Sequence, residues 1–189
     1  MAGFARRPDT LGTRVDSTRV AGAESATVWI VVISDFHCER CQAVALEMVP
    51  ILRREFIETG VARMAFVTFP QDSRFNSRFA AHAALCAGSS GRFWEMHDSL
   101  FATLPTWDRM NDPRPYFDSL AVRAGARPED QRSCTERQRL LPLISDDIER
   151  SQAAGAVVVP TVIVGDHRLA GDSLTLDAVR GAVKAARKR

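Results

Sequence analysis

The stretch TVWIVVIS, residues 27–34, limits the possible folds more than any other part of the chain. It is a continuous apolar run rich in β-branched residues, which is typical of a strand buried on both faces. From Cys38 the period changes, and apolar residues recur at helical spacing up to residue 59. Gly60 ends this predicted helix, and VARMAFVTFP at 61–70 predicts a second strand. A strand, a helix and a strand with short joints form a right-handed βαβ unit with parallel strands.

The predicted helix contains Pro50, which has no N–H to donate to the carbonyl of Leu46, so we expect a kink there. Near the end of the chain, VVVPTVIVG at 157–165 predicts another strand. A Gly-Asp turn and HRLAG follow it, which suits an antiparallel hairpin partner. The final segment, LTLDAVRGAVKAARKR, predicts a helix with Ser173 placed to cap it.

Between these two parts of the chain lie more than eighty residues without a strand pattern, too long for a bare loop. Helical spacing is present in SRFAAHAALCAG, GRFWEMHDSLFA, DPRPYFDSLAVRAG and RQRLLPLISDDIERSQAAG. We therefore predict an α/β protein in which a helical subdomain, residues 71–155, interrupts a small domain formed by residues 25–70 and 156–189. Residues 1–24 are predicted to be a polar, flexible leader.

Composition excludes several classes of function. The 189-residue chain has a formal net charge of +2, which gives no support for nucleic-acid binding. No stretch approaches the roughly 18 apolar residues of a membrane span. The first residues carry a pair of arginines but no apolar segment after them, so this sequence shows no export signal. We expect either a cytosolic protein or one whose targeting segment was removed, and the sequence does not indicate an oligomeric state.

The four cysteines are Cys38, Cys41, Cys86 and Cys134, an even number that permits two bridges. A C-x-x-C pair such as Cys38–Cys41 can be half of a zinc clamp, a structural bridge or a redox centre. A zinc clamp requires a second pair of Cys or His at comparable spacing, which the chain lacks. His82 and Cys86 would share a helix face, but ordinary packing explains such a pair more often than ligation. We therefore predict no metal site and no cofactor.

A redox role explains the position of the pair better. Cys38 at the start of the helix would face unpaired backbone N–H groups and the positive end of the helix dipole, and both favour the thiolate. Such settings lower a cysteine pKa from about 8.5 toward roughly 3.5–7.5. Cys41, one turn later, would point inward and act as the resolving thiol. The spacing therefore predicts a reversible disulfide with Cys38 as the nucleophile.

Four elements together resemble the DsbA-like thiol–disulfide oxidoreductases of the thioredoxin superfamily. They are SDFHCERC after a strand, Pro50 in the next helix, GRFWEMHDSLF in the helical insert and VVVPTVIVG before the last helix. The resemblance covers residues 25–187 and implies a thioredoxin fold with the helical subdomain inserted before the strand that carries a cis-proline. It also implies that the Val159–Pro160 bond is cis, with Pro160 beside the active-site cysteines. Val159 and Thr161 would then bind an extended substrate peptide by strand addition.

The sequence departs from the family in two places. Glu39 and Arg40 stand between the cysteines, where proline is common; the acid should disfavour a Cys38 thiolate and the arginine should favour it. Val32 occupies the position where relatives carry a buried acid that moves a proton for the inner cysteine. A reductase needs that acid more than an oxidase does, so its loss favours an oxidase. Asp35 is closer to the motif, but we expect it to be exposed at the strand end.

Cys86 and Cys134 both lie in the predicted helical insert, in AALCAG and RSCTER. Some DsbA-like relatives carry a second bridge in this subdomain, so the resemblance implies a structural disulfide between them, while two buried free thiols are the alternative. Trp94 and His97 also lie in the insert. Their helical spacing assigns them to its core and rim, without a catalytic role.

The leading hypothesis is a dithiol oxidase that introduces disulfides into cysteine-containing polypeptides through a Cys38–Cys41 disulfide. The first alternative is a reductase or isomerase on the same scaffold, and the second is a non-catalytic peptide-binding module. The resemblance also implies a membrane-bound, quinone-linked partner that reoxidises the protein. An oxidase implies a bacterial cell-envelope location, periplasmic or extracytoplasmic, because disulfides persist in oxidising compartments.

Overall fold

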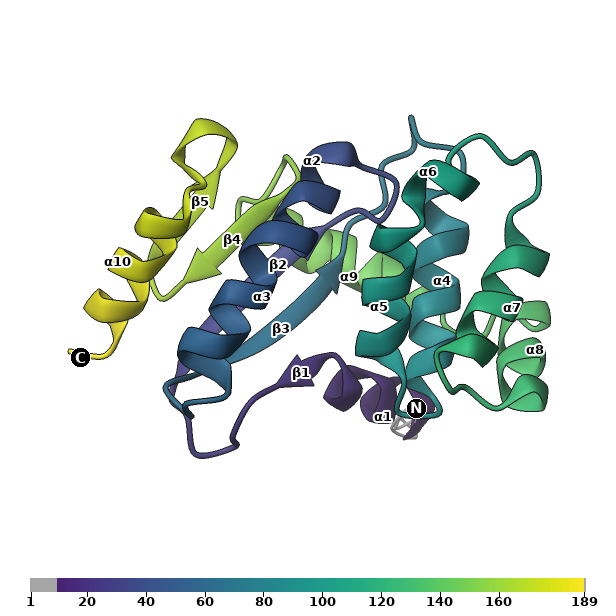
Figure 1. Ribbon diagram of the computed structural model, residues 1–189, viewed down its shortest axis with the longest axis horizontal. Coiled ribbons are helices and arrows are strands. Elements are labelled where there is room, and N and C mark those ends of the chain that lie inside the picture. The colour runs from purple at the N-terminus through teal and green to yellow at the C-terminus, as the bar shows by residue number, and fades with distance from the viewer. Residues whose placement is uncertain (1–9, 189) are drawn as a thin grey trace, which may run out of the picture.

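The computed structural model describes residues 10–188. Within this range the strands form one five-stranded sheet in the order β1-β3-β2-β4-β5 (Figure 1). Neighbours β2 and β3 are parallel, and the other adjacent pairs are antiparallel. The predicted parallel βαβ unit and the antiparallel hairpin are therefore confirmed. The strands are β1 (Val20–Ala21), β2 (Val28–Ser34), β3 (Ala62–Thr68), β4 (Thr161–Val164) and β5 (His167–Ala170).

One helical run connects β2 to β3, as the sequence predicts, but its winding changes along its length. It consists of α2 (Glu39–Ala43), the π-helical η1 (Val44–Met48), α3 (Val49–Leu52) and the π-helical η2 (Arg53–Ile57). In η1 the N–H of Val49 donates to the carbonyl of Val44, five residues earlier. Pro50 follows at once and cannot donate to the carbonyl of Leu46, so the wider turn accommodates the missing hydrogen bond.

The segment between β3 and β4 is helical, in agreement with the sequence prediction. Its helices are α4 (Ser77–Gly88), α5 (Phe93–Ala102), α6 (Leu104–Trp107), α7 (Arg114–Arg123), α8 (Pro128–Glu136) and α9 (Leu141–Ala153). The central helix is α4, which contacts α5, α7, α8 and α9 (Figure 1). It is rich in buried alanine, and side chains this small let several helices approach it closely. The sequence did not predict α6 and α8 as separate helices.

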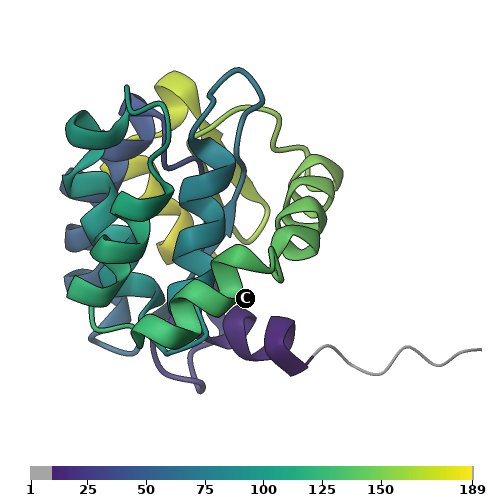
Figure 2. The ribbon, with the colours of Figure 1, turned by 90° about the vertical axis from the view of Figure 1, so that its right-hand side faces the viewer.

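Helices cover both faces of the sheet. Ile30 and Val32 of β2 belong to the same hydrophobic cluster as Val49 of α3 and Val179 of α10 (Leu176–Ala186). Ile33 points to the other face, where Ile148 of α9 packs in a second cluster. Figure 2 shows α9 on the side of the sheet opposite α2. Because β2 is covered on both faces, its nearly continuous apolar sequence is explained.

The structure differs from the predicted flexible leader over residues 10–24. Here α1 (Thr10–Thr18) packs on α4 and β1 joins the sheet edge. The buried Arg19 forms an ion pair with the buried Asp147 of α9, which also accepts hydrogen bonds from the backbone and the hydroxyl of Thr68. A charged residue of this segment, Arg19, is therefore buried and forms part of the folded structure. Residues 1–9 lie outside the described residues, and the division into residues 25–70, 71–155 and 156–189 stays a prediction.

The last helix also begins differently from the prediction. Ser173 lies in a short 3-10 turn, η3 (Gly171–Ser173), and its hydroxyl accepts from the N–H of Ala170. The N-cap of α10 is Thr175, whose hydroxyl accepts a hydrogen bond from the N–H of Ala178 at 3.2 Å. Throughout residues 10–188, helices with the length and apolar character of a membrane span are absent.

Candidate active site

Cys38 is the N-cap residue of α2. Its backbone is extended, with φ −131° and ψ 118°, and its sulfur accepts a hydrogen bond from the N–H of Cys41 at 3.3 Å. This arrangement is the usual one for an N-cap, with sulfur in place of the oxygen of serine or aspartate. The side chain of Cys38 keeps 7% of its surface exposed, whereas Cys41 is fully buried, and both thiols are free. The outer and inner positions that the sequence predicts are therefore present.

The two thiols have opposite electrostatic surroundings. The Cys41 thiol donates a hydrogen bond to the Cys38 sulfur, and this bond, together with the Cys41 N–H, lowers the pKa of Cys38 to about 7 against the effect of burial. The pKa of Cys41 is raised well above the ordinary range, first by burial and then by the neighbouring Cys38. At neutral pH the pair therefore shares one proton, which resides on Cys41 while much of Cys38 is thiolate.

Asp35 is buried at the end of β2, with 1% of its surface exposed, so the prediction of an exposed residue is wrong. One carboxylate oxygen accepts from the N–H of His37 at 2.9 Å. The other accepts from the N–H of Gln71 at 3.1 Å and from the hydroxyl of Ser77 at 2.8 Å. Burial raises the pKa of Asp35 and these hydrogen bonds oppose the change. The carboxylate joins the turn before Cys38 to the β3–α4 loop and the first turn of α4.

Two charges outside the C-x-x-C motif act on Cys38. The carboxylate of Asp35 raises the pKa of Cys38, and the guanidinium of Arg74 in the β3–α4 loop lowers it. From the sequence, Glu39 and Arg40 are the residues predicted to have this effect. Both side chains are exposed on the first turn of α2, and their influence on Cys38 stays a prediction. Asp35 was within reach of sequence reasoning, since it follows a buried strand and precedes the motif, but nothing in the sequence places Arg74 there.

The Val159–Pro160 bond is cis, which confirms the prediction for this bond. Strand β4 begins only at Thr161, later than the predicted residue 157, because a proline cannot donate to a ladder. Thr161 pairs with Ile33 of β2 in antiparallel register. Continuing that register places Pro160 beside Ser34, whose hydroxyl forms a hydrogen bond that lowers the pKa of Cys41. The proline therefore lies at the same end of the sheet as the cysteine pair.

The residues predicted to bind a peptide differ in accessibility. Thr161 is buried, and its hydroxyl donates to the carbonyl of Val158 at 2.6 Å, so its side chain serves the loop itself. Val159 is half-buried, while the side chains of Val157 and Val158 are 71% and 51% exposed. The apolar surface offered by this loop thus lies mainly on Val157 and Val158, which were not among the residues predicted to bind substrate.

Cys86 of α4 and Cys134 of α8 form a disulfide, as the resemblance implies. Both cysteines are buried, and the bond joins two helices of the insert. His97 of α5 is also buried, within 4.6 Å of the Phe66 ring centroid, and Trp94 packs on it at 5.2 Å. These two residues belong to the aromatic core, in agreement with the sequence prediction.

A family model described as Thioredoxin matches residues 14–185. The chain belongs to this thioredoxin family. Disulfide bond formation protein D of Bacillus subtilis is 24% identical over 150 residues, which are 78% of this chain and 67% of that protein. The Na(+)/H(+) antiporter NhaA 1 of Salinispora arenicola is 29% identical over 174 residues. These residues are 90% of this chain but 25% of the antiporter, so the chain spans a quarter of that relative.

Solved structures of the family extend the comparison. The crystal structure of oxidised BdbD from Bacillus subtilis matches with a TM-score of 0.81 at 21% identity, covering 90% of this chain and 93% of that one. Chlamydia trachomatis DsbA matches with a TM-score of 0.74 at 22% identity, covering 90% of each chain. The predicted resemblance to DsbA-like proteins and the thioredoxin fold with a helical insertion are confirmed.

Proposed function

We propose that this protein is a thiol–disulfide oxidoreductase that oxidises paired thiols in other polypeptides through a Cys38–Cys41 disulfide. The observation that carries the proposal is the position of Cys38 at the N-cap of α2, where its sulfur accepts the N–H of the fully buried Cys41. This arrangement lowers the pKa of Cys38 and raises that of Cys41. The names of the relatives support it, since one is a disulfide bond formation protein and another is a DsbA.

In the oxidised protein, a substrate thiolate would attack the sulfur of Cys38. The Cys38–Cys41 bond breaks, and its electron pair goes to Cys41, which takes up a proton. A second thiolate of the same substrate then attacks the substrate sulfur of the mixed disulfide, and Cys38 leaves as a thiolate. The substrate gains one disulfide, and the protein gains two electrons as a dithiol. The low pKa of Cys38 makes it a good leaving group in the second step.

The same surroundings disfavour catalysis in the reducing direction. A reductase must form a Cys41 thiolate, which attacks Cys38 in the mixed disulfide and releases the substrate. Burial and the neighbouring Cys38 both oppose that thiolate. Position 32, on the same strand, is valine and cannot accept the proton. Stabilisation of the Cys38 thiolate also stabilises the reduced protein, and a stabilised reduced form makes a disulfide a strong oxidant.

The substrate would approach along the cis-proline loop and the β3–α4 loop. Support comes from exposed apolar side chains on both loops: Val157 and Val158 before Pro160, and Phe75, which is 71% exposed and follows Arg74. The residue before a cis-proline does not continue the ladder, so the backbone of Val159 is a candidate for pairing with an extended peptide. Thr161, also predicted to bind substrate, would act by holding this loop through its bond to Val158.

We also propose a bacterial cell-envelope location and a membrane-bound, quinone-linked partner that accepts the two electrons. The bridge between Cys86 and Cys134 supports an oxidising compartment, because such bonds are rare where thiols are kept reduced. The cycle requires an electron acceptor, since a dithiol oxidase must lose two electrons after each turnover, and the membrane-bound, quinone-linked character of that acceptor is inferred from the resemblance to DsbA-like proteins.

The test is the reduction potential of the Cys38–Cys41 pair, measured by equilibration with glutathione. An oxidase should lie well above the roughly −270 mV of thioredoxin. It should also oxidise a reduced peptide with two cysteines quickly and reduce insulin slowly. A potential near that of thioredoxin together with rapid insulin reduction would assign the protein to the reductases instead.

A further inference from the structure

A second cluster of nucleophilic side chains lies in the helical insert, away from the C-x-x-C pair in the sequence. Cys86 on α4 is bonded to Cys134 on α8, and His82 lies one turn before Cys86. The ligand atoms of these three residues lie within 4.8 Å of one another, and all three side chains are buried. His82 Nε2 is 3.8 Å from Cys86 Sγ. The fold thus unites residues whose sequence spacing gave no metal-binding pattern.

Nε2 of His82 lies next to Cys86 Sγ and to the backbone N–H of Leu140. The N–H of Leu140 donates to Nε2 at 3.4 Å, so Nε2 is the unprotonated nitrogen. This hydrogen bond is long and therefore weak, and little is lost if Nε2 binds another group. An imidazole nitrogen that carries no proton is the one that binds metals.

We propose that the reduced protein binds a thiophilic divalent cation of the Zn²⁺ type through His82, Cys86 and Cys134, and that formation of the Cys86–Cys134 disulfide abolishes this site. A dithiol reductant would supply two electrons and two protons to the bond and become a disulfide itself. Cation binding would then release the two thiol protons. The insert would hold a metal in its reduced state and a disulfide in its oxidised state, but never both.

The dimensions and charges suit such an ion. Zn–S bonds of about 2.3 Å and Zn–N bonds of about 2.0–2.1 Å in a tetrahedron place ligand atoms roughly 3.5–3.8 Å apart. The observed distance from His82 Nε2 to Cys86 Sγ is 3.8 Å, which matches this range, and the sulfur of Cys134 must move away from that of Cys86 once their bond is reduced. Two thiolates neutralise a divalent cation, which reduces the cost of burying it. Cys86 and Cys134 both lie near the C-terminal ends of their helices, where the dipole favours a cation.

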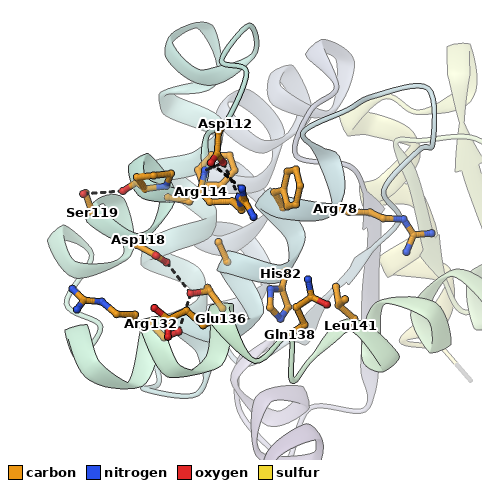
Figure 3. Close-up of a pocket in the computed structure, with 15 residues that line it drawn as sticks. Arg78, His82, Asp112, Arg114, Asp118, Ser119, Arg132, Glu136, Gln138 and Leu141 are labelled. Carbon is orange, nitrogen blue, oxygen red and sulfur yellow. Dashed lines mark hydrogen bonds and ion pairs between the residues drawn. The ribbon is translucent and has the colours of Figure 1, made fainter.

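A cavity gives access to the cluster and room for a solvent ligand. It has a volume of about 630 Å³ and is lined by residues of α4, α7 and α8, including His82 and Thr135, the neighbour of Cys134. Figure 3 shows His82 among its lining residues, close to the turn that carries Gln138. Three protein ligands beside an open cavity leave a fourth position for water, as in zinc sites that are not fully enclosed.

The test uses the full chain with Cys38→Ser and Cys41→Ser, so the active-site thiols cannot bind the probe. The Cys86–Cys134 bond is reduced anaerobically, the reductant is removed, and Co²⁺ is titrated as a spectroscopic substitute for Zn²⁺. We expect one Co²⁺ per chain, with thiolate charge-transfer and tetrahedral d–d absorption, and displacement of Co²⁺ by Zn²⁺. The oxidised protein should show none of these bands. The outcome does not depend on the proposed oxidase activity, which this variant lacks.

His82→Ala in the same background identifies the histidine as a ligand. Loss of an outer partner of a metal ligand costs roughly 10–100-fold in affinity, and loss of the ligand itself should cost more. His167→Ala, which removes an exposed histidine of β5, is the matched control and should leave the affinity unchanged. Unaltered binding in His82→Ala would overturn the proposal, as would equal binding by the oxidised protein. If the reduced protein loses its far-UV circular dichroism, Zn²⁺ should restore it; failure at saturating Zn²⁺ would also overturn the proposal.

Discussion

The two cysteine pairs of this chain have opposite positions on their helices. Cys38 precedes the first turn of α2, where its sulfur accepts a backbone N–H, and Cys41 follows one turn later. Cys86 and Cys134 lie near the C-terminal ends of α4 and α8, separated by 48 residues. A helix N-terminus stabilises a thiolate and a C-terminus destabilises it. Position along the helix thus suits one pair to exchange and the other to remain bonded.

The largest expected effect is on oxidase activity, which should depend on the Cys38–Cys41 pair and not on the Cys86–Cys134 pair. Cys38→Ser should reduce the oxidation of a dithiol peptide to the uncatalysed rate, because no other sulfur of the pair is accessible to attack. Replacement of both Cys86 and Cys134 by alanine should leave the rate within a few-fold of the parent protein. The measurement is the initial rate of disulfide formation, followed by mass spectrometry of the peptide.

The result of this comparison can contradict the assigned roles in two ways. Retention of activity in Cys38→Ser would favour the non-catalytic, peptide-binding alternative. A collapse of activity in the folded Cys86→Ala/Cys134→Ala protein would show that the second pair takes part in the cycle. Circular dichroism of each variant distinguishes a lost reaction from a lost fold.

The second expected effect is on the free energy of unfolding, which should depend more on the Cys86–Cys134 pair than on the Cys38–Cys41 pair. The Cys86–Cys134 bond closes a loop of 48 residues, and the chain-entropy relation gives a stabilisation of about 4 kcal/mol for a loop of this length. The Cys86→Ala/Cys134→Ala protein should therefore lose about that free energy of unfolding. Cys38→Ser/Cys41→Ser removes only a short loop and should lose much less. Urea unfolding at a single pH measures both, and equal losses would remove the structural distinction between the pairs.

A third effect is the pH dependence of stability between pH 7 and 9, to which the reduced Cys38–Cys41 pair should contribute and the bonded Cys86–Cys134 pair should not, because bonded cysteines do not titrate. The pKa of Cys38 falls from 9.0 to about 7 in the folded protein. Between these values the unfolded chain retains a proton that the folded protein has lost, so stability rises with pH, by at most about 3 kcal/mol. Below pH 7 this contribution is lost.

The contribution of Cys41 to the pH dependence of stability has the opposite sign. Its pKa is raised in the folded protein, so it lowers stability once the pH exceeds 9.0, its unfolded value. The reduced protein should therefore be most stable near pH 9 with respect to this pair. Unfolding is measured anaerobically from pH 7 to 9, above the range in which histidines titrate, after gentle reduction of the active-site pair. A Cys38→Ser protein should lack the rise in this window, and a rise of equal size in that variant would assign it to other groups.

The parts of the fold that follow from short-range pattern were predictable. A few neighbouring residues were enough to indicate three of the observed elements. The apolar run at 27–34 indicated β2, the change of period at Cys38 indicated the helical run that starts with α2, and the apolar residues around Pro160 indicated β4. Contacts between distant segments were not predictable. Asp35 is buried because Ser77 and Gln71 lie 42 and 36 residues away in the sequence and donate to it.

Two further elements were missed for related reasons. Strand β1 has only two residues and exists because β3 offers it an edge, so its own letters carry no strand pattern. The π-helical turns around Pro50 depend on how the backbone re-pairs after a missing donor, which helical periodicity does not reveal. The position of His82 beside Cys134 likewise arises from the packing of α4 on α8.

The smallest expected effect tests which charges adjust the reactive pair. Asp35→Asn should lower the pKa of Cys38, because it removes the buried negative charge that opposes the thiolate. Arg74→Gln should raise it, because it removes the positive charge that supports the thiolate. The measurement is the pH dependence of Cys38 alkylation, read by mass spectrometry, with Cys41 unlabelled throughout. Glu39→Gln is the matched control for the first change: it also removes one acid, but from an exposed position where water screens the charge. It should lower the pKa of Cys38 less than Asp35→Asn does. A larger effect from Glu39→Gln would show that the motif's own dipeptide, and not the buried carboxylate, adjusts the difference between the two cysteine pairs.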